Sequence, residues 1–332
     1  MSKRLMRSPE RQFKTPSLRA KRSNPFRSIK LGLGCVVAML LAVTPVFSPL
    51  AMATNVDCLD KGAALAYWQP IREQAATTEL TADELAIELV SCLGSSSAEL
   101  RDRIGYELFT YWLRQEKLSD ETRSALLIVL SANVADTSAD NGLRRSFSAL
   151  ILAEVMRSDA ISAFMDDGER QTLLDTGVAA LRNESDFRGL EPGIGWVHPV
   201  AHLSDLLWRF ALHPATTAEQ AREILGGVKS KVAPTGVAWS FNEGDRLARV
   251  VAMLIRKELL PAEFVGAWIA EFETPQSMEK WSSAFQSQEG MAELHNTKQF
   301  LRALSDQLNG EDIDPAIAEP LAALVQGFTQ LI

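Results

Sequence analysis

Apolar residues recur at helical spacing along nearly the whole chain after residue 56, and no stretch shows the strict alternation that a strand requires. Helix-start signals interrupt the pattern at short intervals. Thr81 and Glu84 have the spacing of a capping box, and Ser96 and Glu99 have it again. Thr217 and Gln220 are expected to start a further helix. The pattern predicts about a dozen helices of roughly 12–20 residues joined by short turns.

Prolines and glycines predict several helix boundaries. Pro70 is expected to end the first helix, and Gly226–Gly227 to end the helix that Thr217 begins. Thr274-Pro275 is expected to begin a helix, because a proline in the first turn loses no hydrogen bond. The stretch from Asn183 to Val197 is expected to be the longest loop.

Consecutive helices with short connections predict an all-α fold of stacked antiparallel pairs, an α-solenoid of the HEAT or armadillo type. No clean sequence repeat accompanies the helices. An α/α-toroid and a globular helical bundle therefore stay open as alternatives.

Residues 1–53 have the three parts of a secretory signal peptide. A basic segment (1–30) precedes an apolar segment (31–50), and Ala51-Met52-Ala53 predicts cleavage after Ala53. We expect residues 54–332 to form a single all-helical domain that is exported to the periplasm or the exterior. An uncleaved N-terminal membrane anchor is the alternative.

Removing this leader changes the charge of the chain. The whole sequence carries 34 Lys and Arg and 42 Asp and Glu; the leader holds ten of the former and one of the latter, which leaves 24 and 41 and a formal charge of −17. A domain this acidic repels nucleic acid and anionic lipid surfaces. We therefore expect no nucleic-acid partner and no peripheral membrane binding.

Two cysteines, Cys58 and Cys92, remain outside the leader. An even pair in an exported protein predicts a disulfide, and two buried thiols are the alternative.

The stretch from Arg188 to Pro214 concentrates the polar chemistry. On one helix, His198, His202, Asp205, Arg209 and His213 fall within an arc of about 80°. Two imidazoles and a carboxylate from His198, His202 and Asp205 are a sufficient ligand set for zinc. Against a metal, Pro199 makes His198 an N-cap with extended backbone, whose ring need not point with His202. The alternative is a polar network in which Asp205 and Arg209 pair along the helix.

The preceding glycine-rich loop carries Asp186, Arg188 and Trp196, and such loops on rigid scaffolds often form binding sites. The alternative is that Asp186 and Arg188 hold the loop in place by an ion pair. Arg145 lies at a helix start, where a cation needs a partner carboxylate or a bound anion; Asp245 and Arg246 begin another helix. The candidate ligand-binding residues are Arg145, Asp186, Arg188, Trp196, His198, His202, Asp205, Asp245 and Arg246.

Five segments in order resemble the bacterial family of domain of unknown function 2785. They contain Ile104-Gly-Tyr-Glu, Arg144-Arg145-Ser-Phe, Asp186-Phe-Arg188-Gly, Gly195-Trp-Val-His198-Pro and Asp245-Arg246-Leu. The resemblance spans roughly Leu85 to Arg256. It implies an all-helical fold and supplies no catalytic residues.

Two functional hypotheses follow. The first is a binding or scaffold module with a polar concave pocket for a protein or a small molecule. The second is a metal-assisted, hydrolase-like enzyme that uses His198, His202 and Asp205, with zinc as the cofactor. Neither the reaction nor the ligand is defined by the sequence.

Overall fold

The computed structural model describes residues 58, 60–75, 81–137 and 142–331. The predicted signal peptide and its cleavage site lie outside these residues. The fold is all-α, as predicted, and the twelve α-helices of the described part are α1 (Lys61–Glu73), α2 (Ala82–Leu89), α3 (Glu107–Arg114), α4 (Asp120–Ala135), α5 (Leu143–Ile161), α6 (Asp167–Asn183), α7 (Pro199–Leu212), α8 (Ala218–Val232), α9 (Glu243–Arg256), α10 (Ala262–Ala270), α11 (Gln288–Leu308) and α12 (Pro315–Gln330).

Four tighter or wider helical segments complete the described helices. Three are 3-10 helices, η1 (Val90–Gly94), η3 (Glu271–Glu273) and η4 (Trp281–Gln286). The fourth, η2 (Glu99–Tyr106), is a π-helix, a rare conformation that is frequent at functional sites.

The predicted capping box at Thr81 is present, and Thr217 starts a helix as predicted. The predicted box of Ser96 and Glu99 is not formed, because the helical segment from Glu99 has Ala98 as its N-cap and no side-chain cap. Thr81 Oγ1 accepts the Glu84 amide while the Glu84 side chain accepts the Thr81 amide, and Thr217 with Gln220 repeats the arrangement. Each box satisfies two backbone donors that a helix start leaves without partners. The sequence therefore locates these two helix starts correctly.

Two predicted helix ends are wrong. Helix α1 continues through Pro70, because Trp68 and Ile71 on either side of it are buried and packing outweighs one lost hydrogen bond. Helix α8 continues through Gly226–Gly227 to Val232. A Cβ at Gly227 would lie 3.3 Å from Val178 Cγ1, so the glycine allows close packing on α6 instead of ending the helix.

The helix predicted to begin at Pro275 does not form. The carboxylate of Glu293 in α11 accepts the amides of Gln276 and Ser277, which satisfies this backbone outside a helix. The prediction of no strands is also wrong in one place. Strands β1 (Leu190–Glu191) and β2 (Gly195–Trp196) form a short antiparallel hairpin within the predicted loop.

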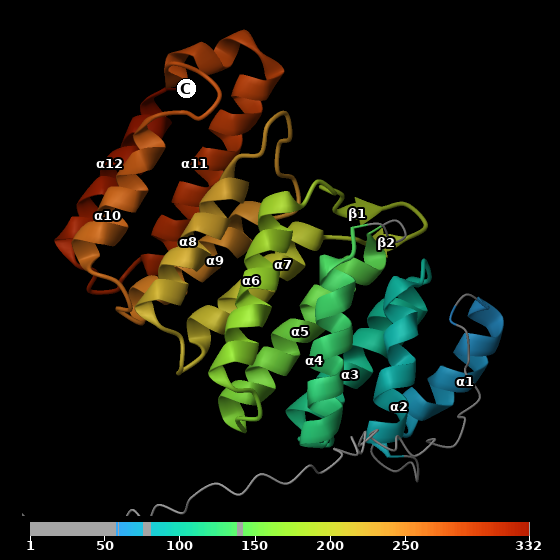
Figure 1. Cartoon of the computed structure of the whole chain (residues 1–332). Helices are drawn as coiled ribbons and strands as arrows, with labels where there is room; N and C mark the ends of the chain where they lie inside the picture. Colours follow the sequence, from blue (N-terminus) through green and yellow to red (C-terminus); the bar gives the residue numbers. More distant parts are fainter. Residues whose placement is uncertain (1–57, 59, 76–80, 138–141, 332) are drawn as a thin grey trace, which may run out of the picture. The chain divides into compact units, whose positions relative to one another are not determined.

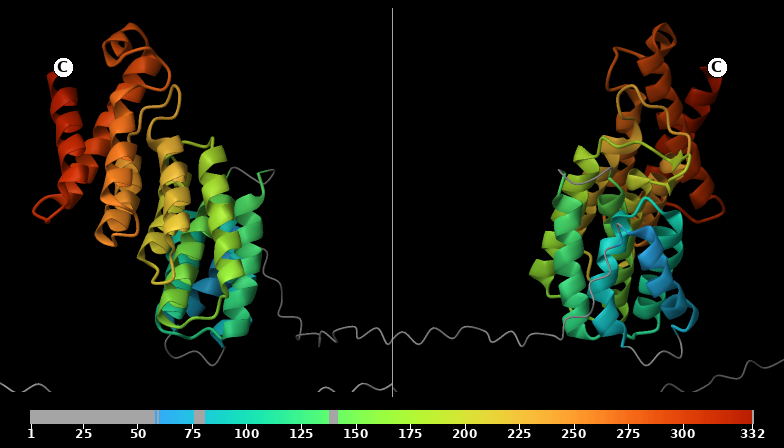
Figure 2. Two further views of the ribbon diagram at one scale, coloured as in Figure 1. Left: turned by 60° about the vertical axis from the view of Figure 1, so that its left-hand side comes forward. Right: turned by 90° about the vertical axis from the view of Figure 1, so that its right-hand side faces the viewer.

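The helices from α3 onward pack in two layers (Figures 1 and 2). In one layer α5 packs against α7, α7 against α9 and α9 against α11; in the other α4 packs against α6 and α6 against α8. The pairs α4–α5, α6–α7 and α8–α9 join the layers. This arrangement brings the N-terminal ends of α7 and α9, which are far apart in sequence, next to each other.

One continuous apolar core runs between the layers, with Trp112, Phe109, Phe210 and Phe300 among its largest buried side chains. Gly266 shows how closely the last helices approach. A Cβ at this position would lie 2.0 Å from the Ala316 carbonyl oxygen, so only glycine permits the observed contact of α10 with α12.

Cys58 and Cys92 form a disulfide, as predicted, with their Cα atoms 5.1 Å apart. The bond joins the segment before α1 to η1, and both cysteines are buried. Among the described residues, no helix combines the length and the apolar content needed to cross a membrane.

Candidate functional site

A pocket of about 420 Å³ opens where α7 and α9 begin, beside η2 and the first turns of α5. It brings together four of the predicted site residues, Trp196, His198, His202 and Arg246. The full lining is Asp102, Tyr106, Phe147, Leu150, Trp196, His198, His202, Phe241, Asn242 and Arg246. The pocket is thus mainly aromatic, with a few polar groups, as is usual for small-molecule sites.

The loop that leads into this pocket is held at its start by Glu184, which is buried. Its carboxylate accepts two hydrogen bonds from Arg145, at 3.2 and 2.7 Å, and the amides of Ser185 and Asp186 at 2.9 and 2.8 Å. The Glu184 carbonyl oxygen accepts from Lys231 Nζ at 2.7 Å. Glu184 is therefore the partner carboxylate that Arg145 needs at a helix start. Arg145 holds the start of the loop and does not line the pocket.

Asp186 and Arg188 pair with each other, with Arg188 Nε 2.8 Å from Asp186 Oδ1. This ion pair holds the loop in place, as the alternative to a binding role predicted. Neither residue lines the pocket. Gly189 next to them lies against the Phe241 ring, where an added Cβ would come within 1.9 Å of Cδ2. The absence of a side chain at Gly189 thus allows Phe241 to form one wall of the pocket.

The hairpin above the pocket is anchored by Arg101, a completely buried residue of η2 that sequence reasoning missed. Its guanidinium donates to the carbonyl oxygens of Ser95, Ile194 and Trp196 at 2.9, 3.0 and 3.1 Å. It also donates to both carboxylate oxygens of Asp102 at 2.8 and 3.2 Å. One arginine thus joins η2 to the tip and the end of the hairpin.

His198 is the N-cap of α7 and Pro199 is its first residue, as predicted, but the backbone of His198 is left-handed, not extended (φ 51°). Its ring stacks on Trp196, with centroids 4.9 Å apart, and its Nε2 lies 2.9 Å from the Phe241 carbonyl oxygen. A carbonyl can only accept, so Nε2 carries a proton. Asn242, the N-cap of α9, is also left-handed, and such strained residues cluster at functional sites.

Glu243 lies behind His198, with its Oε1 3.4 Å from His198 Nε2. Burial by itself would raise the pKa of Glu243, but hydrogen bonds from His198 and from the amides of Glu243 and Phe241 hold it below its usual value. The carboxylate therefore stays ionised and keeps the His198 ring in place.

His202 has a single hydrogen-bonded ring nitrogen. Its Nδ1 lies 2.8 Å from Ser146 Oγ, and that hydroxyl donates its only proton to the Val197 carbonyl oxygen. The hydroxyl must therefore accept from His202, so the proton of the neutral ring is on Nδ1 and Nε2 carries a lone pair. Among the described residues Nε2 has no hydrogen-bond partner, although His202 is only 9% exposed and lines the pocket.

Two pocket groups have shifted pKa values. Burial, reinforced by the nearby His198 and Arg246, lowers the pKa of His202 to about 3, so the ring is neutral at physiological pH. Burial raises the pKa of the Asp102 carboxyl, and the Arg101 guanidinium partly opposes this shift. The pocket therefore presents two acceptors, the His202 lone pair and the Asp102 carboxylate, among aromatic rings.

Asp205 does not pair with Arg209, contrary to one prediction. It accepts from Arg246 Nη1 of α9 at 2.7 and 2.6 Å, whereas Arg209 donates to Glu154 of α5 at 2.7 Å. The helices packed on either side of α7 supply both partners, which the spacing along α7 cannot reveal.

The predicted zinc site at His198, His202 and Asp205 is not formed. His198 directs Nε2 to the Phe241 carbonyl, Asp205 faces Arg246, and the two imidazole rings are 6.1 Å apart between centroids. In the described parts of the chain, no group of three or more His, Cys, Asp or Glu side chains could hold a metal ion. The physical reason is that Ser146, the Phe241 carbonyl and Arg246 each hold one of these three side chains, and the spacing along α7 does not specify such partners.

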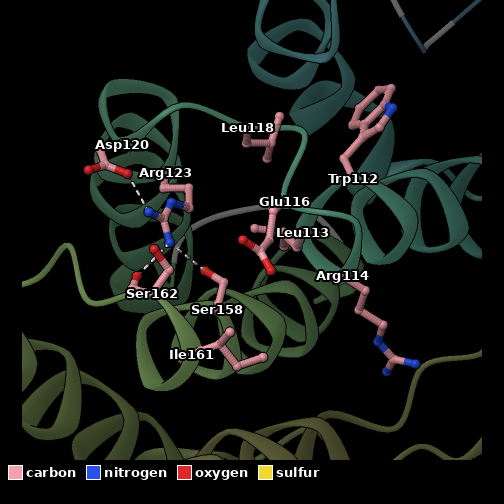
Figure 3. Close-up of a pocket in the computed structure, with 10 residues that line it drawn as sticks. All are labelled: Trp112, Leu113, Arg114, Glu116, Leu118, Asp120, Arg123, Ser158, Ile161 and Ser162. Carbon is pink, nitrogen blue, oxygen red and sulfur yellow. Dashed lines mark hydrogen bonds and ion pairs between the residues drawn. The ribbon is translucent and has the colours of Figure 1, made fainter.

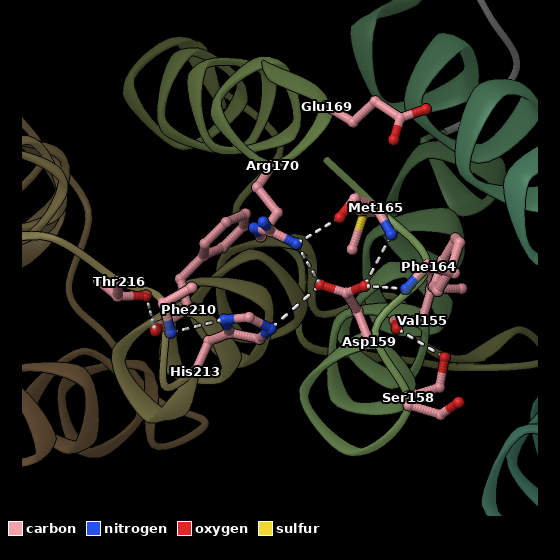
Figure 4. A network of polar contacts seen from close by, with 12 residues as sticks. Val155, Ser158, Asp159, Phe164, Met165, Glu169, Arg170, Phe210, His213 and Thr216 are labelled. Atoms are coloured by element: carbon pink, nitrogen blue, oxygen red, sulfur yellow. Dashed lines mark hydrogen bonds and ion pairs between the residues drawn. The ribbon is translucent and has the colours of Figure 1, made fainter. Parts of the chain in front are cut away.

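Asp245 is exposed and does not line the pocket, and its backbone carbonyl accepts a hydrogen bond from Gln307 Nε2. His213 lies at the far end of α7 in a separate network (Figure 4). There its Nε2 is 3.1 Å from Asp159, whose carboxylate also accepts from Arg170 and from the amides of Phe164 and Met165. These two predicted polar residues therefore lie outside the site.

A smaller pocket of about 210 Å³ lies between α4 and the end of α5 (Figure 3). Its buried Arg123 is hydrogen-bonded to Asp120, to Ser158 and to the carbonyl oxygen of Ser162. The guanidinium also lies over the Phe164 ring, 4.3 Å from its centroid. Arg123 thus links α4 to α5 and has a structural role.

Sequence reasoning missed Arg101, Asp102, Ser146 and the aromatic wall of Phe147 and Phe241. A signal existed for Arg101, which lies three and seven residues before the buried Ile104 and Leu108 and so falls on the apolar face of its helix. No comparable signal marks Ser146, because its role depends on Val197 and His202 of other segments.

Fold and site together define an all-helical protein with an aromatic pocket at the adjoining starts of two helices. Residues 130–305 match the family described as protein of unknown function (DUF2785), and the chain belongs to this family. The match begins and ends further along the chain than the predicted span from Leu85 to Arg256. It includes His198, His202 and Arg246 but neither Asp102 nor Tyr106. No curated protein and no solved structure matches the chain.

Proposed function

We propose that this protein binds a small molecule in the pocket at the starts of α7 and α9, and that it does so as an exported binding protein. The observation that carries the proposal is the His202 Nε2 lone pair, which has no partner among the described residues although the side chain is nine-tenths buried. His202 lines the pocket, so a donor group of a ligand bound there would give Nε2 a hydrogen-bond partner.

The low pKa of His202 favours binding over catalysis. A general base works best when its pKa is near the operating pH, and the pKa of His202 is about 3. Burial disfavours the charged imidazolium, so Nε2 can accept a hydrogen bond from a ligand but takes up a proton poorly at neutral pH. The enzyme hypothesis also needed three converging ligands, and these side chains have separate partners.

The lining indicates the chemistry of the ligand. Hydroxyl or amino groups would donate to His202 Nε2 and Asp102, and a flat or apolar part would contact Trp196, Phe147 and Phe241. The pocket volume of about 420 Å³ falls in the range of small-molecule sites.

Export and the solenoid form belong to the same proposal. The basic and apolar leader with its Ala51-Met52-Ala53 site supports export, and the Cys58–Cys92 disulfide fits an oxidising compartment. The stacking of α5, α7, α9 and α11 in one layer supports an α-solenoid of the HEAT or armadillo type.

The test compares wild type with His202→Phe, which keeps a planar ring and removes the acceptor. Thermal-shift screening with small amino and hydroxy compounds should give hits on wild type that His202→Phe loses. The control is His295→Phe, since His295 is exposed and lies outside the pocket. Nitrogen NMR of the imidazole should show a proton on Nδ1 and none on Nε2, with the Nε2 resonance moving when a hit binds. A proton on Nε2 in the free protein, or equal binding by His202→Phe, would refute the proposal.

A further inference from the structure

Next to the pocket, four arginines surround two carboxylates. These six residues belong to α5, α7, α9 and the last residue of α3. Arg114 of α3 and Arg209 of α7 both pair with Glu154 of α5, at 2.8 and 2.7 Å. Arg246 and Arg249 of α9 both face Asp205 of α7, at 2.6 and 3.7 Å. No third carboxylate pairs with any of the four among the described residues, so two positive charges are in excess.

Trp208 joins these two groups into one surface. The Arg249 guanidinium lies 3.3 Å from the centroid of its ring, and the Arg209 guanidinium lies 4.7 Å from it. We call the surface formed by Arg114, Arg209, Arg246, Arg249 and Trp208 the arginine face. Stacking on the indole holds the guanidiniums in place while their edges stay available as donors.

In the arginine face, three of the four cations are more exposed than the two anions, whereas Arg209, at 16%, is about as buried as Asp205. The carboxyl side chains of Glu154 and Asp205 are 5% and 15% exposed. Arg114, Arg246 and Arg249 are 43%, 39% and 37% exposed. A ligand approaching from solvent therefore meets guanidinium groups before carboxylates.

Several of these donors are unused. Arg249 makes no hydrogen bond within the described structure, because its nearest carboxylate oxygen is 3.7 Å away. Arg246 uses only Nη1, which leaves Nε and Nη2 without protein partners among the described residues. Burial lowers the pKa of Arg249, and the neighbouring Arg246 and Arg209 lower it further against the attraction of Asp205. The cluster is thus incompletely neutralised.

The arginine face differs in charge from the rest of the molecule. The chain has a formal charge of −8, so a surface with excess arginine is not an average sample of its composition. Arginine presents a planar pair of donors that matches both oxygens of a carboxylate or a phosphate. We propose that the arginine face binds a small ligand that carries two or more carboxylate or phosphate groups.

This inference goes beyond the proposed pocket ligand, although Arg246 borders both surfaces. Arg209 and Arg249 do not line the pocket, so variants at these positions test the arginine face alone.

The experiment is calorimetric titration of the full mature protein with pyrophosphate and with citrate at low ionic strength. Arg249→Gln and Arg209→Gln should each weaken the binding of the preferred anion about tenfold, as expected for the loss of one charge-assisted contact. Arg249→Lys should also weaken it, because lysine keeps the charge and loses the paired donors. The matched control is Arg222→Gln, an exposed arginine that also lies over an aromatic ring, that of Phe264, and it should bind as wild type does.

Preference for pyrophosphate over citrate would assign a phosphate ligand, and the reverse would assign a carboxylate ligand. Absence of millimolar or tighter binding of both anions to wild type would overturn the proposal, and so would equal binding by folded Arg209→Gln and Arg249→Lys. These two variants decide the result if Arg249→Gln does not fold. His202→Phe should keep anion binding, so failure of the arginine face and failure of the pocket can be told apart.

Discussion

His202 is held in one protonation state by Ser146, which is distant in sequence, and by burial beside His198 and Arg246. Ser146 is committed to the Val197 carbonyl, so its hydroxyl oxygen can only accept from Nδ1. Burial next to His198 and Arg246 disfavours a second proton on the ring. The result is a neutral imidazole whose remaining lone pair is set by geometry and not by the solution pH.

This state has a consequence for stability at acidic pH. An unfolded histidine titrates near pH 6.5, whereas folded His202 titrates near 3. Between these values the unfolded chain binds the extra proton, so the stability contributed by His202 is complete above about pH 6.5 and is lost as the pH falls towards 3. The expected loss is about 2 kcal/mol between pH 6.5 and 5, at about 1.4 kcal/mol per pH unit.

Urea unfolding of wild type and His202→Phe at several pH values measures this contribution. The free energy of unfolding of wild type should decrease more steeply over this range than that of the variant. Parallel curves for the two proteins would show that folded His202 titrates normally. His295→Phe should keep the wild-type slope.

At the scale of elements, the hairpin β1–β2 is too short to be stable by itself and depends on contacts with η2. Arg101 supplies them through the carbonyl oxygens of Ile194 and Trp196, while the amides of Val197 and His198 donate back to Gly189 and Arg188. The π-helix η2 and the hairpin therefore form one unit, and this unit carries Trp196 over the pocket.

Arg101→Met should destabilise the protein by about 3–5 kcal/mol, because it leaves Asp102 and three carbonyls without their buried partner. Hydrogen exchange at the Val197 and His198 amides should become faster than in wild type. Arg103→Met is the control, since Arg103 is 66% exposed and its change should shift stability by less than about 0.5 kcal/mol. Unchanged exchange in a folded Arg101→Met protein would mean that the hairpin is held by other contacts.

For the whole molecule, the leader and the disulfide together predict export, cleavage of the leader and oxidation of the two cysteines. A chain exported through a cleaved signal peptide would begin at Thr54 and would be oxidised at Cys58 and Cys92. The bond closes a loop between residues 34 positions apart and should contribute up to about 4 kcal/mol to stability.

Expression of the full sequence in a bacterium, followed by cell fractionation, tests whether the protein is exported and cleaved. The exported fraction should contain a protein whose intact mass corresponds to residues 54–332 less two hydrogens. Cys58→Ser should lower the unfolding free energy as much as reduction of wild type does. A full-length product in the membrane fraction would favour the N-terminal anchor instead.

The sequence alone determined the features that depend on neighbours along the chain. Helical periodicity established the all-α class, and the capping boxes at Thr81 and Thr217 located helix starts, because a cap needs only residues within one turn. His198-Pro199 marked the start of α7 for the same reason. The disulfide could be predicted because two cysteines outside the leader allow only one pairing.

The tertiary structure decided what depends on residues from different helices. Gly226–Gly227 does not end α8 because α6 packs against it, and Asp205 pairs with Arg246 instead of Arg209 because α9 lies beside α7. The lone pair of His202 is on Nε2 because α5 places Ser146 next to Nδ1. Such contacts join segments tens of residues apart, and no local spacing records which helices will be neighbours. The pocket and the arginine face are both consequences of that packing.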